Sequence, residues 1–289
     1  MRDISTLGFD TKLCAVIGNP IAHSMSPAIH NAGYDALDLN FIYFPCEVEN
    51  VEGMLEGMRA MHNFRGLSVT IPHKMSIIPL VDEINEVDKH IGSINTIVKE
   101  GDKLIGLGTD GPGALKAFHD ADVDLTGKVI LILGCGGVAR AIAFSLAAQA
   151  GVSELVLLDI DEGFLNGLAT DLSKGTATKI TSALLDDQNL SEAMNRSDVI
   201  INCTPIGMHP KDDATVVPQD LFREGQVIFD AVYNPLETRL LKEAKERGCK
   251  TISGVEMFIN QAVLQFERFT GKDAPVEVMR KVVLEKLSA

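Results

Sequence analysis

One stretch in the middle of the chain restricts the fold more than any other. Val129–Leu133 contains five apolar residues without interruption, the glycine-rich Gly134–Gly137 follows, and an alanine-rich helical pattern runs through Val138–Ala150. A strand buried on both faces of a parallel sheet has such an unbroken apolar sequence. A glycine-rich turn between strand and helix lets backbone N–H groups and the helix N-terminus approach a pyrophosphate. The stretch therefore predicts a dinucleotide-binding βαβ unit.

Further short apolar runs alternate with helical patterns along the chain, which is typical of an α/β protein with largely parallel sheets. The expected strands are Leu13–Ile17, Phe41–Phe44, Gly66–Val69, Ser93–Val98, Lys103–Leu107, Leu155–Leu158, Val199–Asn202 and Val227–Phe229. The fold class is thus predicted to be α/β, with an N-terminal α/β substrate domain and a Rossmann-type doubly wound dinucleotide-binding domain. We place the first domain at residues 1–113 and the second at 114–254. The helical segment 255–289 is expected to return to the first domain.

Charge and composition exclude several classes of protein. The chain has 289 residues and a formal net charge of -14, which disfavours binding to nucleic acids and to anionic membranes. No apolar stretch reaches the ~18 residues that span a bilayer, and residues 1–10 lack the apolar segment of a secretory signal. We therefore expect a cytoplasmic protein with neither nucleic-acid nor membrane partners.

The cysteines and other metal-ligating residues predict no metal site. There are five cysteines, an odd number, and no two of them form a CxxC pair. Buried, reduced thiols are the expected interpretation.

Asp159 is the residue that bears on the choice of dinucleotide. It ends the strand after the glycine loop, where an acidic side chain accepts hydrogen bonds from the adenosine ribose. A 2′-phosphate would meet this carboxylate, and no Lys or Arg occurs between Asp159 and Asp171. The pattern favours NAD and leaves NADP possible. The alternative is that Asp159 or Asp161 only caps the following helix.

Polar residues at expected strand ends in the first domain suggest a substrate site. Ser24 and Ser26 precede a helix whose first expected residue is Pro27, and two hydroxyls beside a helix N-terminus suit a carboxylate. The alternative is that Ser26 merely caps this helix. Lys74 follows another strand, and Asp110 lies at a strand–helix junction. A Lys/Asp pair in one cleft can exchange a proton with a substrate oxygen.

Eight motifs in order then resemble the shikimate/quinate dehydrogenase family over nearly the whole chain. They are GNPIAHSMSPAIHN at 18–31, GLSVTIPHK at 66–74, GSINTI at 92–97, GLGTDGPG at 106–113, GCGGVARA at 134–141, NCTPIGM at 202–208, DAVYNPLETRLL at 230–241 and GVEMFINQAVLQFERFTG at 254–271.

The resemblance implies a role for individual residues. Lys74 and Asp110 correspond to the catalytic pair. The substrate-binding residues it implies are Ser24, Ser26 and Tyr233 for the carboxylate, and Thr70, Asn95, Asp110 and Gln261 for ring hydroxyls. The cofactor-binding residues it implies are Gly134, Cys135, Gly136, Gly137, Val138 and Ala139 for the pyrophosphate, and Ala231 and Gly254 on the nicotinamide side.

The chain departs from the family's motifs at three places. Ser68 stands where the family usually has Asn, although Ser also occurs there. Gly108 replaces the Asn of the family's GxNTD motif, which removes a polar side chain near Asp110. The basic residues that hold the 2′-phosphate of NADP in the family are missing, with Ile160 and Phe164 at those positions. This last departure is similar to the NAD-using quinate/shikimate dehydrogenases.

The resemblance implies reversible, dinucleotide-dependent reduction of 3-dehydroshikimate to shikimate. One alternative is an NAD-dependent dehydrogenase that prefers quinate. A more distant one is a non-catalytic sensor of dinucleotide or of a shikimate-like acid, but Lys74 and Asp110, which a sensor would lose, are both present. The expected partners are small molecules, and the sequence allows a monomer or a homodimer.

Overall fold

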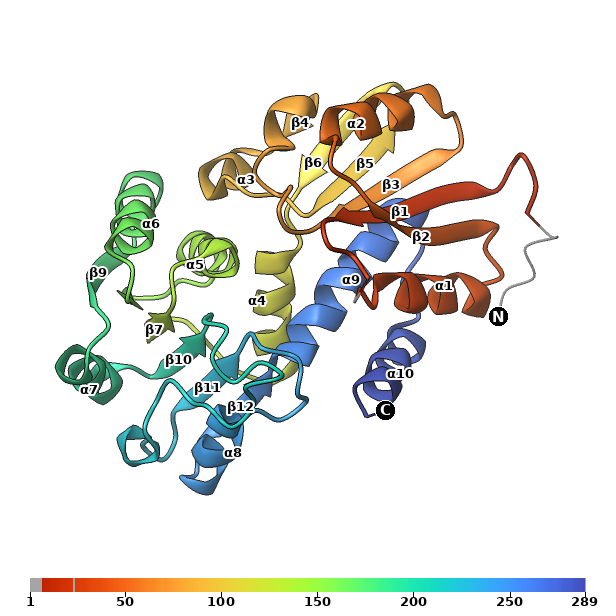
Figure 1. Ribbon diagram of the computed structural model, residues 1–289. Helices are drawn as coiled ribbons and strands as arrows, with labels where there is room; N and C mark the ends of the chain where they lie inside the picture. The colour runs from red at the N-terminus through yellow and green to blue at the C-terminus, as the bar shows by residue number, and fades with distance from the viewer. Residues whose placement is uncertain (1–6, 23, 289) are drawn as a thin grey trace. The chain divides into compact units, whose positions relative to one another are not determined.

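The chain folds into two compact units, shown in the computed structural model of Figure 1, which describes residues 7–22 and 24–288. The first unit contains residues up to 109 together with 261–289, and the second contains 110–260. Residues 110–113 and 255–260, assigned above to the substrate domain, thus group with the second unit. The reason is that helix α4 starts at Asp110, and that helix α9 (Gly254–Thr270) crosses the second boundary.

A six-stranded mixed sheet forms the centre of the first unit. Its strands, in spatial order, are β2 (Phe41–Glu47), β1 (Lys12–Gly18), β3 (Phe64–Val69), β5 (Thr96–Glu100), β6 (Lys103–Leu107) and β4 (Glu83–Ile84). The first three are parallel, whereas β5 is antiparallel to both β3 and β6. The expected strand Ser93–Val98 begins only at Thr96, because Ile94 and Asn95 bond to the backbone of Lys74 and Val69 instead.

The helices of the first unit come from both ends of the chain. They are α1 (Ser26–Ala36), α2 (Val51–Ala60), α3 (Glu86–Ile91), the 3₁₀ turn η2 (Ile78–Leu80), the C-terminal part of α9, and α10 (Val276–Leu287). Gly33 of α1 lies so close to the last two helices that a Cβ there would be 2.8 Å from the Phe266 ring and 3.6 Å from Met279. The C-terminal helices therefore return to the substrate domain, as the sequence predicted.

An aromatic cluster joins α1, β2 and α9 inside the first unit. The ring of His30 stacks on that of Tyr43 at 4.3 Å between centroids, and lies near Phe266 and Phe269. His30 is completely buried. Because burial penalises the charged imidazolium, it lowers the pKa of His30 to about 3.

The second unit contains a six-stranded, fully parallel sheet. Its strands, in spatial order, are β12 (Lys250–Ser253), β11 (Val227–Asp230), β10 (Val199–Asn202), β7 (Val129–Leu133), β8 (Glu154–Asp159) and β9 (Lys179–Leu184). Counted along the chain, this order is 6-5-4-1-2-3, which is that of a dinucleotide-binding Rossmann sheet. The order changes direction between β7 and β10, where such sheets bind their ligands.

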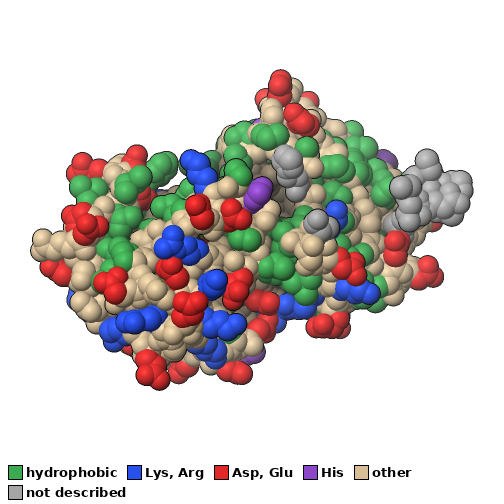
Figure 2. Space-filling model, turned by 60° about the horizontal axis from the view of Figure 1, so that its bottom comes forward, with side chains coloured by type: hydrophobic (Ala, Val, Ile, Leu, Met, Phe, Trp, Pro, Cys, Tyr) green, Lys and Arg blue, Asp and Glu red, His purple; other side chains and the backbone are tan. Residues whose placement is uncertain are grey.

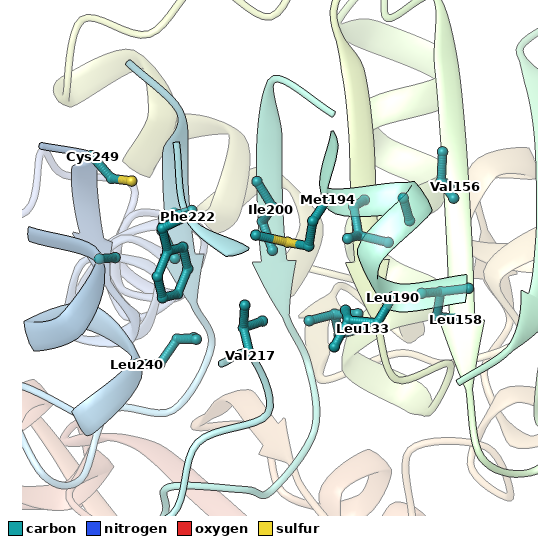
Figure 3. Packing of buried hydrophobic residues seen from close by; sticks show 14 of the residues in the cluster. Leu133, Val156, Leu158, Leu190, Met194, Ile200, Val217, Phe222, Leu240 and Cys249 are labelled. Carbon is teal, nitrogen blue, oxygen red and sulfur yellow. The ribbon is translucent and has the colours of Figure 1, made fainter. Parts of the chain in front are cut away.

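Helices cover both faces of this parallel sheet (Figure 1). They are α4 (Asp110–Asp120), α5 (Gly137–Gln149), α6 (Glu162–Gly175), α7 (Asp187–Arg196), the 3₁₀ turn η3 (Gln219–Leu221) and α8 (Arg239–Glu246). On one face, leucine and methionine side chains of α7 pack on strand residues such as Leu133 and Ile200, as Figure 3 shows. Alternate residues of each strand point to this layer, which explains why strands buried on both faces are apolar throughout.

The surface agrees with the acidic composition. Figure 2 shows carboxylate side chains spread over the visible face, with lysines and arginines interspersed among them. Within residues 7–22 and 24–288, none of the helices combines the length and apolar content that crossing a bilayer requires.

We predict that His30→Phe reduces the loss of stability in acid. The folded-state pKa is depressed below the unfolded value of about 6.5, so the neutral ring stabilises the fold above that pH and this contribution is lost as the pH falls towards 3. Phe keeps the ring stacking but takes up no proton. Chemical denaturation between pH 7 and 4 should show a pH slope reduced by up to about 1.4 kcal/mol per unit. The exposed His62, changed to Gln, is the control, and parallel curves for wild type and His30→Phe would contradict the prediction.

Candidate active site

Two hydroxyls are held together at the start of α1. The Ser24 hydroxyl accepts a hydrogen bond from the Ser26 amide at 3.3 Å. Met25 occupies the cap position and Ser26 is already the first helical residue, so the expectation that Ser26 caps the helix is wrong by one position. The Ser26 side chain therefore lies in the first turn of the helix, where an anion is stabilised.

Lys74 lies in a turn that the rest of the first unit fixes from several sides. β3 ends at Val69, the Thr70 amide donates to Ile17 at 2.9 Å, and the Thr70 carbonyl accepts from the His73 amide. The buried His73 ring bonds the Val48 carbonyl at 2.6 Å through Nε2, which must carry the proton because a carbonyl only accepts. The Lys74 carbonyl accepts from the Ile94 amide at 3.0 Å. These hydrogen bonds fix the backbone on both sides of the turn and at Lys74 itself.

Asn95, Thr109 and Gln261 are brought together and buried. The Asn95 side-chain oxygen accepts from the Thr109 amide at 2.8 Å, and its amide nitrogen donates to the Thr109 hydroxyl at 3.0 Å. That hydroxyl is also 3.5 Å from Oε1 of Gln261. Thr109, which was not among the expected site residues, thus joins two that were. The sequence signal that could have identified Thr109 as a site residue is its position directly before Asp110, in Gly-Thr-Asp.

Asp110 is the first residue of α4. The aligned peptide dipoles of a helix stabilise a negative charge in its first turn. Asp110 thus follows directly on Thr109, whose amide and hydroxyl are held by the Asn95 side chain.

Ser68 and Gln265 extend the same polar cluster. The Ser68 hydroxyl donates to Gln265 Oε1 at 2.9 Å, and Gln265 Nε2 donates to the Asn95 carbonyl and to the Thr96 hydroxyl. All four side chains are buried. Gln265 was not predicted as a site residue, although it lies one helical turn after Gln261 and so shares its face of α9. Ser68, which stands where the family usually has Asn, thus forms a hydrogen bond with α9.

In the second unit, the glycine loop between β7 and α5 has the geometry that a pyrophosphate requires. Gly134 has φ +88°, and a Cβ there would lie 3.0 Å from the Thr204 side chain, so only glycine fits. In the described chain nothing lies within 4 Å of a Cβ placed on Gly136 or Gly137, and α5 starts there without a side-chain cap. The open space and the backbone N–H groups of the helix start suit an anion.

The remaining residues expected at this loop lie in its immediate surroundings. Cys135 is buried at the turn, Val138 is half-buried and Ala139 is buried, the last two in the first turn of α5. The Cys135 amide donates to Oδ2 of Asp159 at 2.5 Å. Asp159 thereby connects the ends of β7 and β8.

Asp159 and Asp161 have different roles at the end of β8. Asp161 caps α6 by accepting from the Phe164 amide, whereas Asp159 accepts from the amides of Cys135 and Asp161. The capping alternative therefore applies to Asp161 alone. A carboxylate offers about four acceptor positions, so Asp159 keeps capacity for ribose hydroxyls.

A buried hydrogen-bond network holds the loop after β11, which contains Ala231 and Tyr233. The Asp230 carboxylate accepts from Thr238, from the Val232 amide and from Asn202 at 2.6, 3.1 and 2.9 Å. Burial raises the pKa of Asp230 to about 6, against the opposing effect of these bonds. Asp230, Asn202 and Thr238 lie in the motifs at 202–208 and 230–241, but the sequence pattern indicated no role for them.

Gly254 and Tyr233 lie beside this network. A Cβ on Gly254 would be 2.6 Å from the carbonyl oxygens of both Ala231 and Val232, so α9 starts in close contact with the loop. The Tyr233 ring, partly exposed, stacks on Phe258 at 4.7 Å between centroids. Burial raises the pKa of its phenol, which stays protonated and able to donate.

Among the residues that the structure describes, no group of three or more His, Cys, Asp or Glu residues is placed to hold an ion.

Models of known families match three parts of the chain. Residues 16–97 match the shikimate dehydrogenase substrate binding domain, and residues 254–284 match the shikimate 5′-dehydrogenase C-terminal domain. Residues 128–240 match the lactate/malate dehydrogenase NAD binding domain.

Individual proteins resemble the chain over nearly its whole length. The shikimate dehydrogenase (NADP(+)) of Moorella thermoacetica is 41% identical over 281 residues, covering 96% of this chain and 95% of its own. The crystal structure of shikimate 5-dehydrogenase from Listeria monocytogenes, in complex with shikimate and NAD, matches with a TM-score of 0.91 at 32% identity, covering 96% and 98%. Quinate dehydrogenase from Corynebacterium glutamicum, in complex with NAD, matches with a TM-score of 0.88 at 28% identity, covering 95% and 99%.

We predict that Gly254→Ala destabilises the second unit. The added methyl would overlap two backbone carbonyls, which cannot move aside as a flexible side chain can. The free energy of unfolding should fall by about 1–3 kcal/mol, as for other overpacked sites, in a denaturant titration. Gly167→Ala in α6 is the matched control, because a Cβ there has open space in the described chain. Equal free energies of unfolding for the two variants would contradict the close contact of Gly254 with the carbonyls of Ala231 and Val232.

Proposed function

The chain belongs to the shikimate dehydrogenase family, and we propose that it catalyses the reversible reduction of 3-dehydroshikimate to shikimate with a nicotinamide dinucleotide. The observation that supports the proposal is that two consecutive residues, Ile94 and Asn95, form hydrogen bonds at or directly before the two expected catalytic residues. Ile94 bonds the backbone of Lys74, and Asn95 bonds Thr109, which precedes Asp110.

Lys74 and Asp110 are the proposed acid–base pair. In the direction of reduction, the Lys74 ammonium donates a proton to the oxygen of the substrate ketone as the carbonyl carbon becomes a secondary alcohol. Oxidation reverses this step, with the amine accepting the proton. Asp110 supports the lysine through its negative charge. The cationic ammonium also stabilises the alkoxide that develops on the substrate oxygen.

The substrate is proposed to be held through its carboxylate and its ring hydroxyls. Ser24 and Ser26 offer hydroxyl donors beside the start of α1, and Tyr233 offers a protonated phenol. Thr70, Asn95 and Gln261 are proposed to bind ring hydroxyls. Asn95 and Gln261 already meet at Thr109, which supports the assignment of both to one site.

The dinucleotide, when bound, supplies or accepts the hydride. The second unit fits it through the open glycine loop, with Gly134–Ala139 proposed around the pyrophosphate. Ala231 and Gly254 are proposed along the nicotinamide, where the buried network of Asp230 holds the loop.

We further propose that NAD is preferred over NADP. The Asp159 carboxylate, at the end of β8, would accept from the ribose hydroxyls and repel a 2′-phosphate. Ile160 and Phe164, both exposed, stand where the family's basic residues hold that phosphate. Arg140, the cation that follows the glycine loop, forms an ion pair with Asp171 at 2.8 Å and lies over the Phe144 ring.

Quinate is the second candidate substrate. The similarity of the chain to a quinate dehydrogenase structure, at a TM-score of 0.88, favours testing it. Quinate has an additional hydroxyl on the carbon that bears the carboxylate, so acceptance depends on the space around Ser24, Ser26 and Tyr233.

The proposed location is the cytoplasm, because all five cysteines are free thiols, which fits a reducing compartment. The proposed ligands are small molecules, and light scattering would distinguish a monomer from a homodimer.

We predict that Lys74→Ala lowers kcat for shikimate oxidation by about 10²–10⁴-fold, the usual contribution of general acid–base catalysis. Dinucleotide affinity, measured by fluorescence titration, should stay unchanged because the glycine loop is untouched. Lys89→Ala removes an exposed lysine of the same unit and should leave kcat as in wild type. Turnover of Lys74→Ala within about tenfold of wild type would disprove the catalytic role.

We predict that wild type has a higher kcat/KM with NAD than with NADP at saturating shikimate, and that Ile160→Arg shifts the ratio towards NADP. The new guanidinium would offset the repulsion of a 2′-phosphate by Asp159. Val278→Arg adds the same charge to α10 and should leave the ratio unchanged. A wild-type preference for NADP would remove the proposed role of Asp159.

A further inference from the structure

A buried carboxyl group outside the expected site binds the backbone next to Asp110. Oδ2 of Asp88 accepts a hydrogen bond from the Gly108 amide at 3.0 Å. The same oxygen accepts from the side chain of Asn85 at 2.6 Å, and the Asp88 amide donates to the Asn85 side chain at 2.7 Å. Asp88 is only 5% exposed. The carboxyl group is thus fixed between the start of α3 and the end of β6.

The same carboxyl group explains why residue 108 is glycine. A Cβ on Gly108 would lie 2.7 Å from Oδ1 of Asp88, which is closer than real Cβ contacts. Gly108 is not among the glycines with positive φ, so its backbone conformation would accept other residues. What excludes a side chain at position 108 is therefore Asp88, and not the backbone.

This arrangement concerns a position where the chain departs from the motifs of its family, which have Asn two residues before the catalytic aspartate. In this chain the polar group beside position 108 is instead the carboxyl of Asp88, which belongs to α3. This carboxyl fills the space that a side chain at 108 would need. The departure at Gly108 and the presence of Asp88 are two parts of one contact.

We infer that Asp88 is a positioning residue for Asp110. We also infer that the pair Asp88 and Gly108 can be replaced by a small residue at 88 together with Asn at 108. Asp88 binds the amide of Gly108 and Asn95 binds the amide of Thr109 at 2.8 Å, so two successive N–H groups before Asp110 are held by side chains. With only one of them held, the peptide could rotate about the remaining bond and change the direction of the Asp110 side chain. The inference rests on the proposed function, in which Asp110 acts with Lys74.

A purely structural role is the competing explanation, because the bonds with Asn85 also form the N-terminal cap of α3. Loss of the cap would lower stability without a specific effect on turnover. The two explanations differ in kcat and in the behaviour of the double variant.

The experiment compares wild type, Asp88→Ala, Gly108→Asn and the double variant in steady-state shikimate oxidation with NAD. Each single variant should lower kcat by about tenfold or more, one by loss of the bond and one by steric overlap, with the KM for NAD within about twofold. In the double variant the Asn side chain enters the space left by the carboxyl, and kcat should return to within about threefold of wild type. Asp88→Asn, which keeps an oxygen acceptor, should retain most of the turnover.

Asp82→Ala is the matched control. Asp82 also accepts from a backbone amide of β6, that of Leu104 at 2.7 Å, but near the other end of the strand. Its removal should leave kcat unchanged even where stability falls. A wild-type kcat in Asp88→Ala, or a double variant no better than the worse single variant, would overturn the inference.

Hydrogen exchange of the Gly108 and Thr109 amides separates this inference from the proposed function. Exchange should become faster in Asp88→Ala and stay as in wild type in Asp82→Ala. If wild type oxidised no shikimate, the proposed function would fail, and faster exchange would still support the positioning role. Unchanged exchange in Asp88→Ala would overturn it whatever the activity.

Discussion

The two adjacent residues Ile94 and Asn95 are the point on which the polar architecture of the first unit depends. The Ile94 amide bonds the carbonyl of Lys74, the Asn95 side chain bonds Thr109, and the Asn95 carbonyl accepts from the Val69 amide. β3, the turn that contains Lys74, and Thr109 are thereby tied to two adjacent residues. Amide and carbonyl groups buried here cannot bond to water. If the partner of one of them moves away, the free energy of the folded state therefore rises. The backbone at Lys74 and the backbone at Thr109 are therefore held by neighbouring residues of the first unit.

Helix α9 supports this arrangement from the opposite end of the sequence. Gln261 and Gln265 supply the polar groups that reach Thr109, Thr96 and Ser68, while Phe266 and Phe269 pack in the aromatic cluster around His30. One helix thus completes both the apolar core and the polar network of the first unit. This explains why an α/β domain formed by the first 109 residues also needs the last 29.

The second unit uses a different means to fix its ligand-binding loop. Asp159 at the end of β8 bonds Cys135 in the glycine loop after β7, and Asp230 at the end of β11 bonds Asn202 at the end of β10. Carboxylates at strand ends thereby hold neighbouring loops while the strands themselves remain apolar. The Asp159 carboxylate is an expected determinant of dinucleotide choice, and the structure gives it a second role in shaping the loop that would bind the pyrophosphate.

The sequence by itself determined the parallel strands of the second sheet's interior, the glycine loop and the expected site residues, because buried strands and tight turns restrict residue type locally. It did not indicate the edge strands β9 and β12, whose alternating or short sequences lack an apolar run because one side of an edge strand stays open. It also placed the cap of α1 at Ser26 instead of Met25. Only the tertiary structure decided the partners of Ser68, Asp88 and Gln265, since these contacts join residues far apart in the chain. Hydrogen bonds of this kind leave no periodic pattern in the sequence, and the packing of strands and helices alone selects them.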